Sequence, residues 1–185
     1  MIIRDLISRL VRHWLAVLLV VVLVSADQLT KYLISHNMAL GESIPTTGFF
    51  RLTYVHNTGS AFGLLQGQNA LLTTASFLGV ALLLWMYRTH GAQAKLLRAS
   101  LALMLAGAMG NLIDRLIYGK VIDFVDIGRW PIFNVADSSI VTGGIVLAWI
   151  MFTTKDSKVK AGDDAGEGTE ALEDTYVAHD QPDSN

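Results

Sequence analysis

Four long apolar segments are the feature that most constrains how this chain folds. They cover residues 14–34, 69–87, 96–117 and 138–154, and the first contains the run WLAVLLVVVLVSA. Each is close to the ~20 residues that a helix needs to cross ~30 Å of hydrocarbon. Because lipid offers no partner to an open backbone N–H or C=O group, spanning segments of this kind must be helical. The pattern therefore predicts an all-α membrane protein with four transmembrane helices.

Composition and charge agree with a membrane class. Charged residues make up 16% of the 185 residues, whereas soluble domains carry about 25%. The net charge of −2 hides a division, because the chain from residue 155 onward holds three basic and nine acidic residues. The basic residues of the body are scattered without interleaved aromatics, so nucleic acid is not an expected partner. The chain has no cysteine, which excludes disulfides, zinc–thiolate sites and cysteine nucleophiles.

The distribution of lysine and arginine predicts which side of the membrane each loop faces. Nine of these residues lie before the first segment, between the second and third, or after the fourth, and five lie on the other side. Cytoplasmic loops carry the excess of positive charge. Both termini are therefore expected in the cytoplasm, with residues of about 35–68 and 118–137 facing outward.

The first segment has an alternative interpretation as a cleavable signal peptide. Basic residues, an apolar run and Val24-Ser25-Ala26 fit that pattern. The helical pattern nevertheless continues through DQLTKYLI, and removal of the segment would leave three spans with the termini on opposite sides. We therefore expect the segment to remain as a transmembrane helix.

The outer loop at 43–56 has the composition of a β-strand. FFRLTYVH is rich in aromatic and β-branched residues and places Phe50, Leu52 and Tyr54 on one face. A second short apolar run lies at 130–133, so we expect a small sheet on the outer membrane surface.

The C-terminal region differs from the rest of the chain. It is acidic, contains several glycines and has almost no large apolar side chains, a composition that is typical of disorder. We expect a membrane domain at 1–155 and a disordered acidic cytoplasmic tail at 156–185.

Carboxylates cluster at one side of the membrane. Charged side chains at membrane depth are costly and are candidates for function. Five of the seven acidic residues in the body lie at or near the outer ends of the predicted spans, namely Asp27, Asp114, Asp123, Asp126 and Asp137.

Asp27 allows two interpretations. Lys31 follows four residues later, and residues at this spacing adjoin on a helix. We favour an ion pair that lets the end of the helix approach the membrane interface. The alternative is a polar anchor that orients other residues of a site.

The third segment also allows a structural and a functional interpretation. Ala102, Ala106 and Gly110 recur at every fourth residue, a spacing that lets helices approach closely. The GNLIDR motif at 110–115 either joins helices, with an interfacial Asp114–Arg115 pair, or supplies donors to a substrate backbone or a lipid head group.

Asp123 and Asp137 suit acid–base chemistry as a pair. Asp123 lies among the apolar residues of VIDFV, where desolvation raises the pKa of an unpaired carboxylate, whereas Asp126 is expected to be solvated. Two carboxylates held together share a proton, so that one acts as base and the other as acid, as in aspartic proteases. The two residues are fourteen apart in sequence, with Gly128 and Pro131 between them, which is enough chain to fold back.

Asp137 has a structural alternative. It stands at the mouth of the fourth segment, where Asp is among the best N-cap residues. Ser138 and Ser139 follow it and can also cap, so this helix start does not require Asp137.

Other chemistries fit the sequence less well. The five histidines are dispersed without HExxH, no serine lies in GxSxG, and there is no Walker loop, so neither a metal nor a cofactor is expected. The main alternative is a non-enzymatic small membrane transporter or scaffold, whose ionisable groups are expected near mid-membrane. A phospholipid head-group transferase is a second alternative, but it needs metal-binding aspartates at helical spacing.

Five sequence blocks of the chain resemble those of one known family, bacterial lipoprotein signal peptidase, also called signal peptidase II. They are DQLTK at 27–31, HNTGSAFG at 56–63, GNLIDR at 110–115, VIDF at 121–124 and FNVADSSI at 133–140. The blocks stand in the family's order over residues of about 10–155, and five ordered blocks are far more specific than one motif. Ser60, where the family commonly has alanine, is a mild departure.

The resemblance implies a fold, a reaction and a set of residues. The family fold is four transmembrane helices with a small extracytoplasmic β-cradle and a short outer helix, and the stretch after Asn57 belongs to that cover. The family is an intramembrane aspartic endopeptidase that removes signal peptides from diacylglyceryl-modified prolipoproteins and cleaves before the lipidated cysteine. Its catalytic aspartates fall on Asp123 and Asp137, and its substrate-binding or supporting residues fall on Asn57, Asn111, Arg115, Asn134, Asp27 and Asp114.

The resemblance also implies a setting. We expect a monomer in the bacterial cytoplasmic membrane, with the active site at the extracytoplasmic face, and with a prolipoprotein substrate and membrane lipid as partners.

Overall fold

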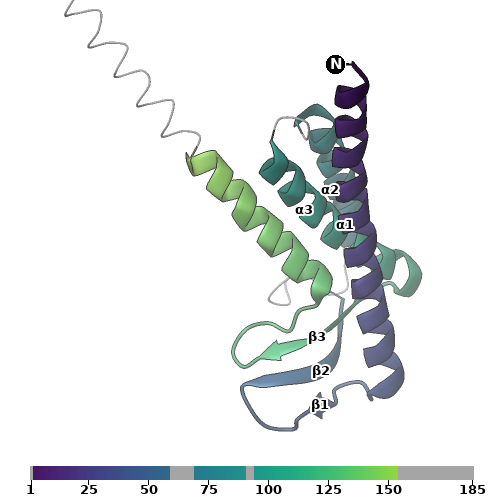
Figure 1. The fold of residues 1–185 in the computed structure, drawn as a ribbon. Coiled ribbons are helices and arrows are strands. Elements are labelled where there is room, and N and C mark those ends of the chain that lie inside the picture. Colours follow the sequence, from purple (N-terminus) through teal and green to yellow (C-terminus); the bar gives the residue numbers. More distant parts are fainter. Residues whose placement is uncertain (1, 59–68, 91–93, 154–185) are drawn as a thin grey trace, which may run out of the picture. The chain divides into compact units, whose positions relative to one another are not determined.

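The structure is a computed structural model that describes residues 2–58, 69–90 and 94–153 (Figure 1). By its internal contacts the chain divides into two compact units, Met1–Leu147 and Ala148–Asn185. The outer helix expected after Asn57 and the acidic tail expected at 156–185 lie outside the described residues. The described helices are α1 (Ile2–Asn37), α2 (Asn69–His90), α3 (Lys95–Tyr118) and a fourth helix at Val135–Thr153.

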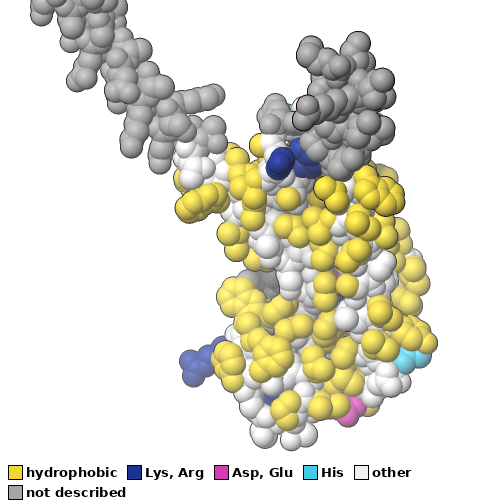
Figure 2. Space-filling model, viewed as in Figure 1, with side chains coloured by type: hydrophobic (Ala, Val, Ile, Leu, Met, Phe, Trp, Pro, Cys, Tyr) yellow, Lys and Arg dark blue, Asp and Glu magenta, His cyan; other side chains and the backbone are white. Residues whose placement is uncertain are grey.

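Four helices of the described chain are long and apolar enough to cross a membrane. The spans are His13–Asn37, Asn69–His90, Lys95–Tyr118 and Val135–Thr153, and their mean hydropathy lies between 1.6 and 1.8. Many of their large apolar side chains are exposed, and α2 has no buried residue, as expected where lipid covers the surface. Figure 2 shows these hydrophobic side chains spread over the helical surface. The predicted four-helix membrane fold is confirmed, and α1 continues unbroken past residues 24–26.

The centre of the bundle is α3, which contacts both α1 and α2. Its small residues Ala102, Ala106 and Gly110 are buried, so the close approach expected from their spacing is present. A Cβ atom at Gly107 would collide with the backbone oxygen of Ala136, which places the start of the fourth helix directly against the α3 backbone.

A three-stranded antiparallel sheet lies at the end of α1 that is opposite the N-terminus (Figure 1). Its strands are β1 (Ser43–Ile44), β2 (Phe50–Asn57) and β3 (Val121–Ile127), in the order β1-β2-β3. The expected small sheet is therefore confirmed, although the segment 43–56 contains two strands rather than one. β2 pairs with β1 and β3, and the run at 130–133 contributes only an isolated bridge to β3.

A β-bulge changes which side of β2 is buried. Leu52 pairs with Val125 and Val55 pairs with Asp123, so β2 has one more residue than β3 over this stretch. A bulge breaks the two-residue alternation of a strand, and consecutive residues Thr53 and Tyr54 are both buried. The expected common face of Phe50, Leu52 and Tyr54 is wrong for this reason.

The turn from α3 to β3 depends on a glycine. Gly119 has a φ of 70° and donates its N–H to the Arg115 carbonyl, a helix ending that favours a residue without Cβ. Asp114 then accepts a hydrogen bond of 3.2 Å from the backbone N–H of Ile122. The first residues of β3 are thereby held against the last turn of α3.

We expect Gly107→Ala to destabilise the protein by about 1–3 kcal/mol, the usual cost of overpacking a close contact. Gly79→Ala is the matched control, because a Cβ there meets no atom within 4 Å and alanine favours a helix over glycine. Thermal unfolding in detergent measures both. Equal melting temperatures for Gly107→Ala and the wild type would contradict the close packing.

Candidate active site

β3 separates two aspartates onto opposite faces. Asp123 and Asp126 are three residues apart, and side chains alternate along a strand. Asp126 is 3% exposed and accepts hydrogen bonds from Arg51 at 2.6 Å and Thr53 at 2.9 Å. The expectation of a solvated Asp126 is therefore wrong, because β2 supplies a cation and a hydroxyl that compensate for its burial.

The chain reverses after β3 and returns along it. Phe133 forms an antiparallel bridge with Val125, with hydrogen bonds of 2.7 and 3.1 Å between their backbone groups. This bridge places the next residue, Asn134, beside Asp123. The fold-back that the sequence permitted is thus made by main-chain pairing.

The fourth helix begins with a reciprocal capping arrangement. The Asn134 side-chain oxygen accepts the backbone N–H of Asp137 at 2.8 Å, and an Asp137 carboxylate oxygen accepts the backbone N–H of Asn134 at 3.3 Å. Asn134 is therefore the N-cap, and Asp137 stands three residues later, as in a capping box. The alternative in which Asp137 is the N-cap is wrong, as is capping by Ser138 or Ser139.

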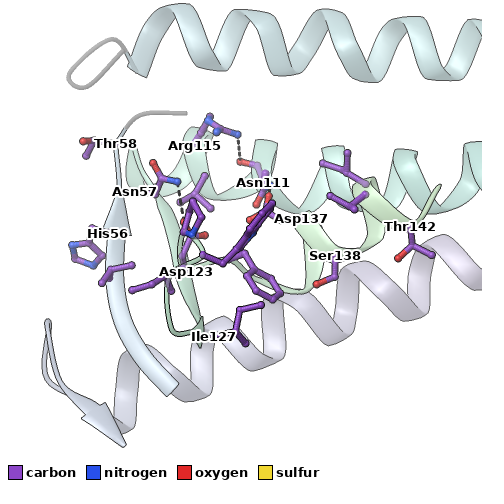
Figure 3. A pocket seen from close by; sticks show the side chains of 18 of the residues that line it. His56, Asn57, Thr58, Asn111, Arg115, Asp123, Ile127, Asp137, Ser138 and Thr142 are labelled. Atoms are coloured by element: carbon purple, nitrogen blue, oxygen red, sulfur yellow. Dashed lines mark hydrogen bonds between the residues drawn. The ribbon is translucent and has the colours of Figure 1, made fainter. Parts of the chain in front are cut away.

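Three asparagine amides hold the two carboxylates of Asp123 and Asp137, and Figure 3 shows two of them, Asn57 and Asn111. Asp123 accepts hydrogen bonds from Asn57 at 2.9 Å and from Asn134 at 2.7 Å. Asp137 accepts one from Asn111 at 2.7 Å. Because Asn134 contacts both aspartates, it fixes the position of one relative to the other.

Both carboxylates line a cavity of about 1020 Å³ (Figure 3). Polar groups of Asn57, Asn111 and Arg115 lie around them at the same wall. Most of the remaining lining is apolar and includes Val121, Ile132, Phe133, Ile140 and Val141. A cavity with an acidic centre and apolar walls suits a ligand that has both polar and hydrocarbon parts.

The pKa of Asp123 is raised from 3.8 to about 6. Burial is the main cause, and the charge of Asp137 adds to it, whereas the amides of Asn57 and Asn134 and the charge of Lys31 oppose it. One proton therefore stays on this carboxyl at pH values where an ordinary aspartate is ionised.

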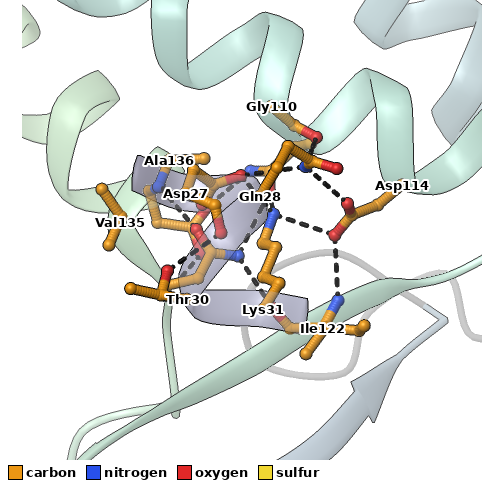
Figure 4. A network of polar contacts seen from close by, with 12 residues as sticks. Asp27, Gln28, Thr30, Lys31, Gly110, Asp114, Ile122, Val135 and Ala136 are labelled. Carbon is orange, nitrogen blue, oxygen red and sulfur yellow. Dashed lines mark hydrogen bonds and ion pairs between the residues drawn. The ribbon is translucent and has the colours of Figure 1, made fainter. Parts of the chain in front are cut away.

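A buried ion network lies behind the cavity (Figure 4). The Lys31 ammonium lies 2.8 Å from Asp27 and 2.8 Å from Asp114, and Gln28 bridges these two carboxylates at 3.3 and 2.9 Å. The expected Asp27–Lys31 pair is present, and both of its side chains are buried inside the protein. The expected Asp114–Arg115 pair is wrong, because Lys31 of α1 takes the Asp114 carboxylate.

Arg115 points to the cavity instead. Its guanidinium donates to Ser76 of α2 at 3.2 Å and to the Asn111 carbonyl at 3.4 Å, and it is part of the cavity lining. This arrangement leaves a cation beside the two carboxylates.

The predicted site residues form two layers, one that lines the cavity and one behind it. Asn57, Asn111, Arg115, Asp123 and Asp137 line the cavity, and Asn134 is fully buried between the aspartates. Asp27 and Asp114 lie one layer behind. Lys31 and Gln28 complete that layer and were not predicted as site residues, although both stand within DQLTK. Among the described residues no cluster of three His, Asp or Glu side chains suits a metal ion.

Residues 19–153 match the family model described as signal peptidase (SPase) II. The chain belongs to the signal peptidase II family. Similar proteins include a lipoprotein signal peptidase of Moorella thermoacetica, which is 50% identical over 133 residues that cover 71% of this chain and 89% of that protein. A second, from Pelotomaculum thermopropionicum, is 42% identical over 144 residues, or 77% of this chain and 95% of that protein.

Solved structures agree with the signal peptidase II fold. A bacterial membrane enzyme determined by the in meso method matches with a TM-score of 0.71 and 31% identity, over 76% of this chain and 88% of that chain. A second such enzyme matches with a TM-score of 0.68 and 32% identity, over 74% and 91% of the two chains.

Membership of the signal peptidase II family settles the class of function. The chain is a protease and a multi-pass protein of the bacterial inner membrane. The transporter, scaffold and head-group transferase alternatives give way to this assignment.

In this signal peptidase II family member, Asp137→Asn is expected to lower the pKa of Asp123, because the charge of Asp137 raises it. The carbonyl band of the protonated carboxyl, followed by infrared spectroscopy against pH, measures the change. Asp126→Asn is the matched control, since Asp126 faces the other side of β3, and it should leave the pKa of Asp123 unchanged. A pKa that stays near 6 in Asp137→Asn would argue against the electrostatic contact between the two carboxyls.

Proposed function

We propose that the chain is an intramembrane aspartic endopeptidase that removes signal peptides from diacylglyceryl-modified prolipoproteins, with Asp123 and Asp137 as its catalytic pair. The cut falls before the lipidated cysteine. One observation carries the proposal: the buried carboxylate of Asp123 and the half-buried carboxylate of Asp137, both bound by Asn134, line one cavity with apolar walls. The naming of the relatives as lipoprotein signal peptidases supports the substrate class.

The proposed chemistry uses the pair as acid and base. The ionised carboxylate takes a proton from a water molecule, whose oxygen attacks the scissile carbonyl carbon, while the protonated carboxyl donates its proton to the carbonyl oxygen. The resulting tetrahedral intermediate collapses when a proton moves to the leaving amine. The raised pKa of Asp123, about 6, supports a pair that retains one proton at pH values up to about 6.

The polar residues around the carboxyls have two proposed tasks, positioning of the pair and binding of the substrate. The side-chain amides of Asn57, Asn111 and Asn134 already donate to the carboxylates, so we assign them the positioning of the pair. Arg115 lines the cavity with a guanidinium that has five N–H donors. It is the side chain that we assign to the substrate carbonyls.

The proposed setting places the site at the extracytoplasmic face, with both termini in the cytoplasm. The sheet, whose strand β3 contains Asp123, lies at the end of α1 opposite the N-terminus (Figure 1), and the positive-inside distribution supports the same orientation. We assign the peptidase to residues 1–155 and expect it to act as a monomer in contact with membrane lipid.

Asp123→Asn and Asp137→Asn are each expected to reduce cleavage of a diacylated precursor by at least ~10³-fold, because an amide cannot exchange the proton. Gel-shift assays follow the cleavage, and mass spectrometry of the product locates the cut. The matched control is Asp126→Asn, a buried aspartate of the same strand that faces away from the cavity and is expected to retain cleavage.

Rates are compared per folded, membrane-inserted molecule. Cleavage by either Asp123→Asn or Asp137→Asn at the rate of the wild type would exclude the pair. A product that begins at a residue other than the lipidated cysteine would exclude the proposed cut.

The pH dependence of kcat/KM is expected to show an alkaline limb with an apparent pKa near 6. The pKa of Asp123 is raised, so the carboxyl holds its proton below this pH and loses it above, which leaves two carboxylates and no acid. Because kcat/KM reports the free enzyme, assays at substrate concentrations below KM between pH 5 and 8 measure it. A rate that rises steadily through this range would contradict the requirement for a proton.

A further inference from the structure

We propose that Lys31 is a positioning residue for the peptidase reaction, because it joins the two backbone segments that carry Asp123 and Asp137 and fixes the amide of Asn111. This inference rests on the proposed function of the pair. Lys31 does not line the cavity, and it acts through other residues.

The three N–H groups of Lys31 have three acceptors. Its Nζ atom lies 2.8 Å from Asp27 Oδ2, 2.8 Å from Asp114 Oδ2 and 3.1 Å from Asn111 Oδ1. An ammonium group has three donors and no acceptor, and the side chain is 2% exposed. The position of Lys31 is therefore fixed by α1 and α3 together.

Each carboxylate bound by Lys31 also holds the residue before a catalytic aspartate (Figure 4). Asp27 accepts the backbone N–H of Ala136 at 2.8 Å, and Ala136 precedes Asp137. Asp114 accepts the backbone N–H of Ile122 at 3.2 Å, and Ile122 precedes Asp123. The ammonium thus links the two main-chain positions whose separation sets the distance between the carboxyls.

Lys31 also determines which way the amide of Asn111 points. The Asn111 oxygen accepts from Lys31 at 3.1 Å and from Asn134 at 3.2 Å, while its nitrogen donates to Asp137 at 2.7 Å. A reversed amide would set its NH₂ group against the ammonium and its oxygen against the carboxylate. The cation therefore keeps a donor directed at Asp137.

The charge of Lys31 also acts electrostatically on the pair of Asp123 and Asp137. It lowers the pKa of Asp123 and so opposes the effects of burial and of Asp137. The other charged groups around this region are Asp27 and Asp114 of the network and Arg115 beside the cavity.

Lys31→Met tests the role, since methionine keeps the length of the side chain without its charge. We expect kcat per folded molecule to fall about 10- to 100-fold, the cost of misplacing reacting groups by a fraction of an ångström, with KM changed less than about twofold. The pKa of Asp123, measured by infrared spectroscopy, should rise. Lys120→Met is the matched control on the outer side, and it should leave both quantities unchanged.

A charge-matched variant separates positioning from folding. Removal of Lys31 alone strands two buried carboxylates, which is strongly destabilising. Asp27→Asn/Lys31→Met keeps the net charge of the network, and an asparagine oxygen at position 27 can still accept the Ala136 N–H. We expect this variant to fold and still to have a low kcat. Recovery of the wild-type kcat and of the pKa of Asp123 would overturn the proposal.

A double-mutant cycle with Asn111→Ala tests the route. If Lys31 acts through Asn111, the losses in kcat from Lys31→Met and Asn111→Ala should be less than additive, and additive losses would exclude that route. Asp123→Asn and Asp137→Asn are assayed beside them. Cleavage by these two would refute the catalytic pair, whereas inactive aspartate variants with fully active Lys31 variants would refute the positioning role alone.

Discussion

The ion pairs between Lys31 of α1 and the carboxylates of Asp27 and Asp114 are the interaction on which the rest of this structure depends. A lysine buried in a membrane helix is costly unless it is fully paired, and here two carboxylates and an amide oxygen surround it. The same carboxylates accept backbone N–H groups at the starts of β3 and the fourth helix. The paired Lys31 ammonium therefore links α1, α3, the sheet and the helix that bears Asp137.

Close helix contact makes this network possible. The missing side chains at Gly107 and Gly110 let α3 approach the start of the fourth helix and the Asp27 carboxylate. Without that approach, Asn111 of α3 and Asp137 of the fourth helix would not be within hydrogen-bond distance. The small residues of α3 thus serve the site as well as the packing of the bundle.

The sequence predicted the helices, the sheet and the list of polar residues because each depends on local patterns. Apolar length identifies the spans, and alternation with aromatic content identifies β2. The partners of the charges were harder to predict. Asp114 is adjacent in sequence to Arg115 and yet pairs with Lys31, since the choice depends on how the helices rotate against each other. Asp126 looked solvated because its partners Arg51 and Thr53 lie on β2, which is far from Asp126 in sequence although it is adjacent in the sheet.

The choice of the catalytic aspartates shows the same limit of prediction from local sequence patterns. Residue types and spacing did not decide whether Asp114 or Asp137 belongs with Asp123, and the motif resemblance was needed to choose. In the structure Lys31 and the Ile122 N–H take the Asp114 carboxylate, whereas Asp123 and Asp137 line the cavity. The capping role of Asn134 was likewise missed, since it requires knowing where the chain turns back along β3.

The three asparagine amides that hold the aspartates have a consequence for proton transfer during the reaction. Asparagine side chains neither gain nor lose protons near neutral pH, and they are the side-chain donors that the described residues give to these two carboxylates. They can orient the pair and adjust its acidity, but they cannot store a proton for it. Of these five side chains, only the two carboxyls can therefore carry the protons that each turnover moves.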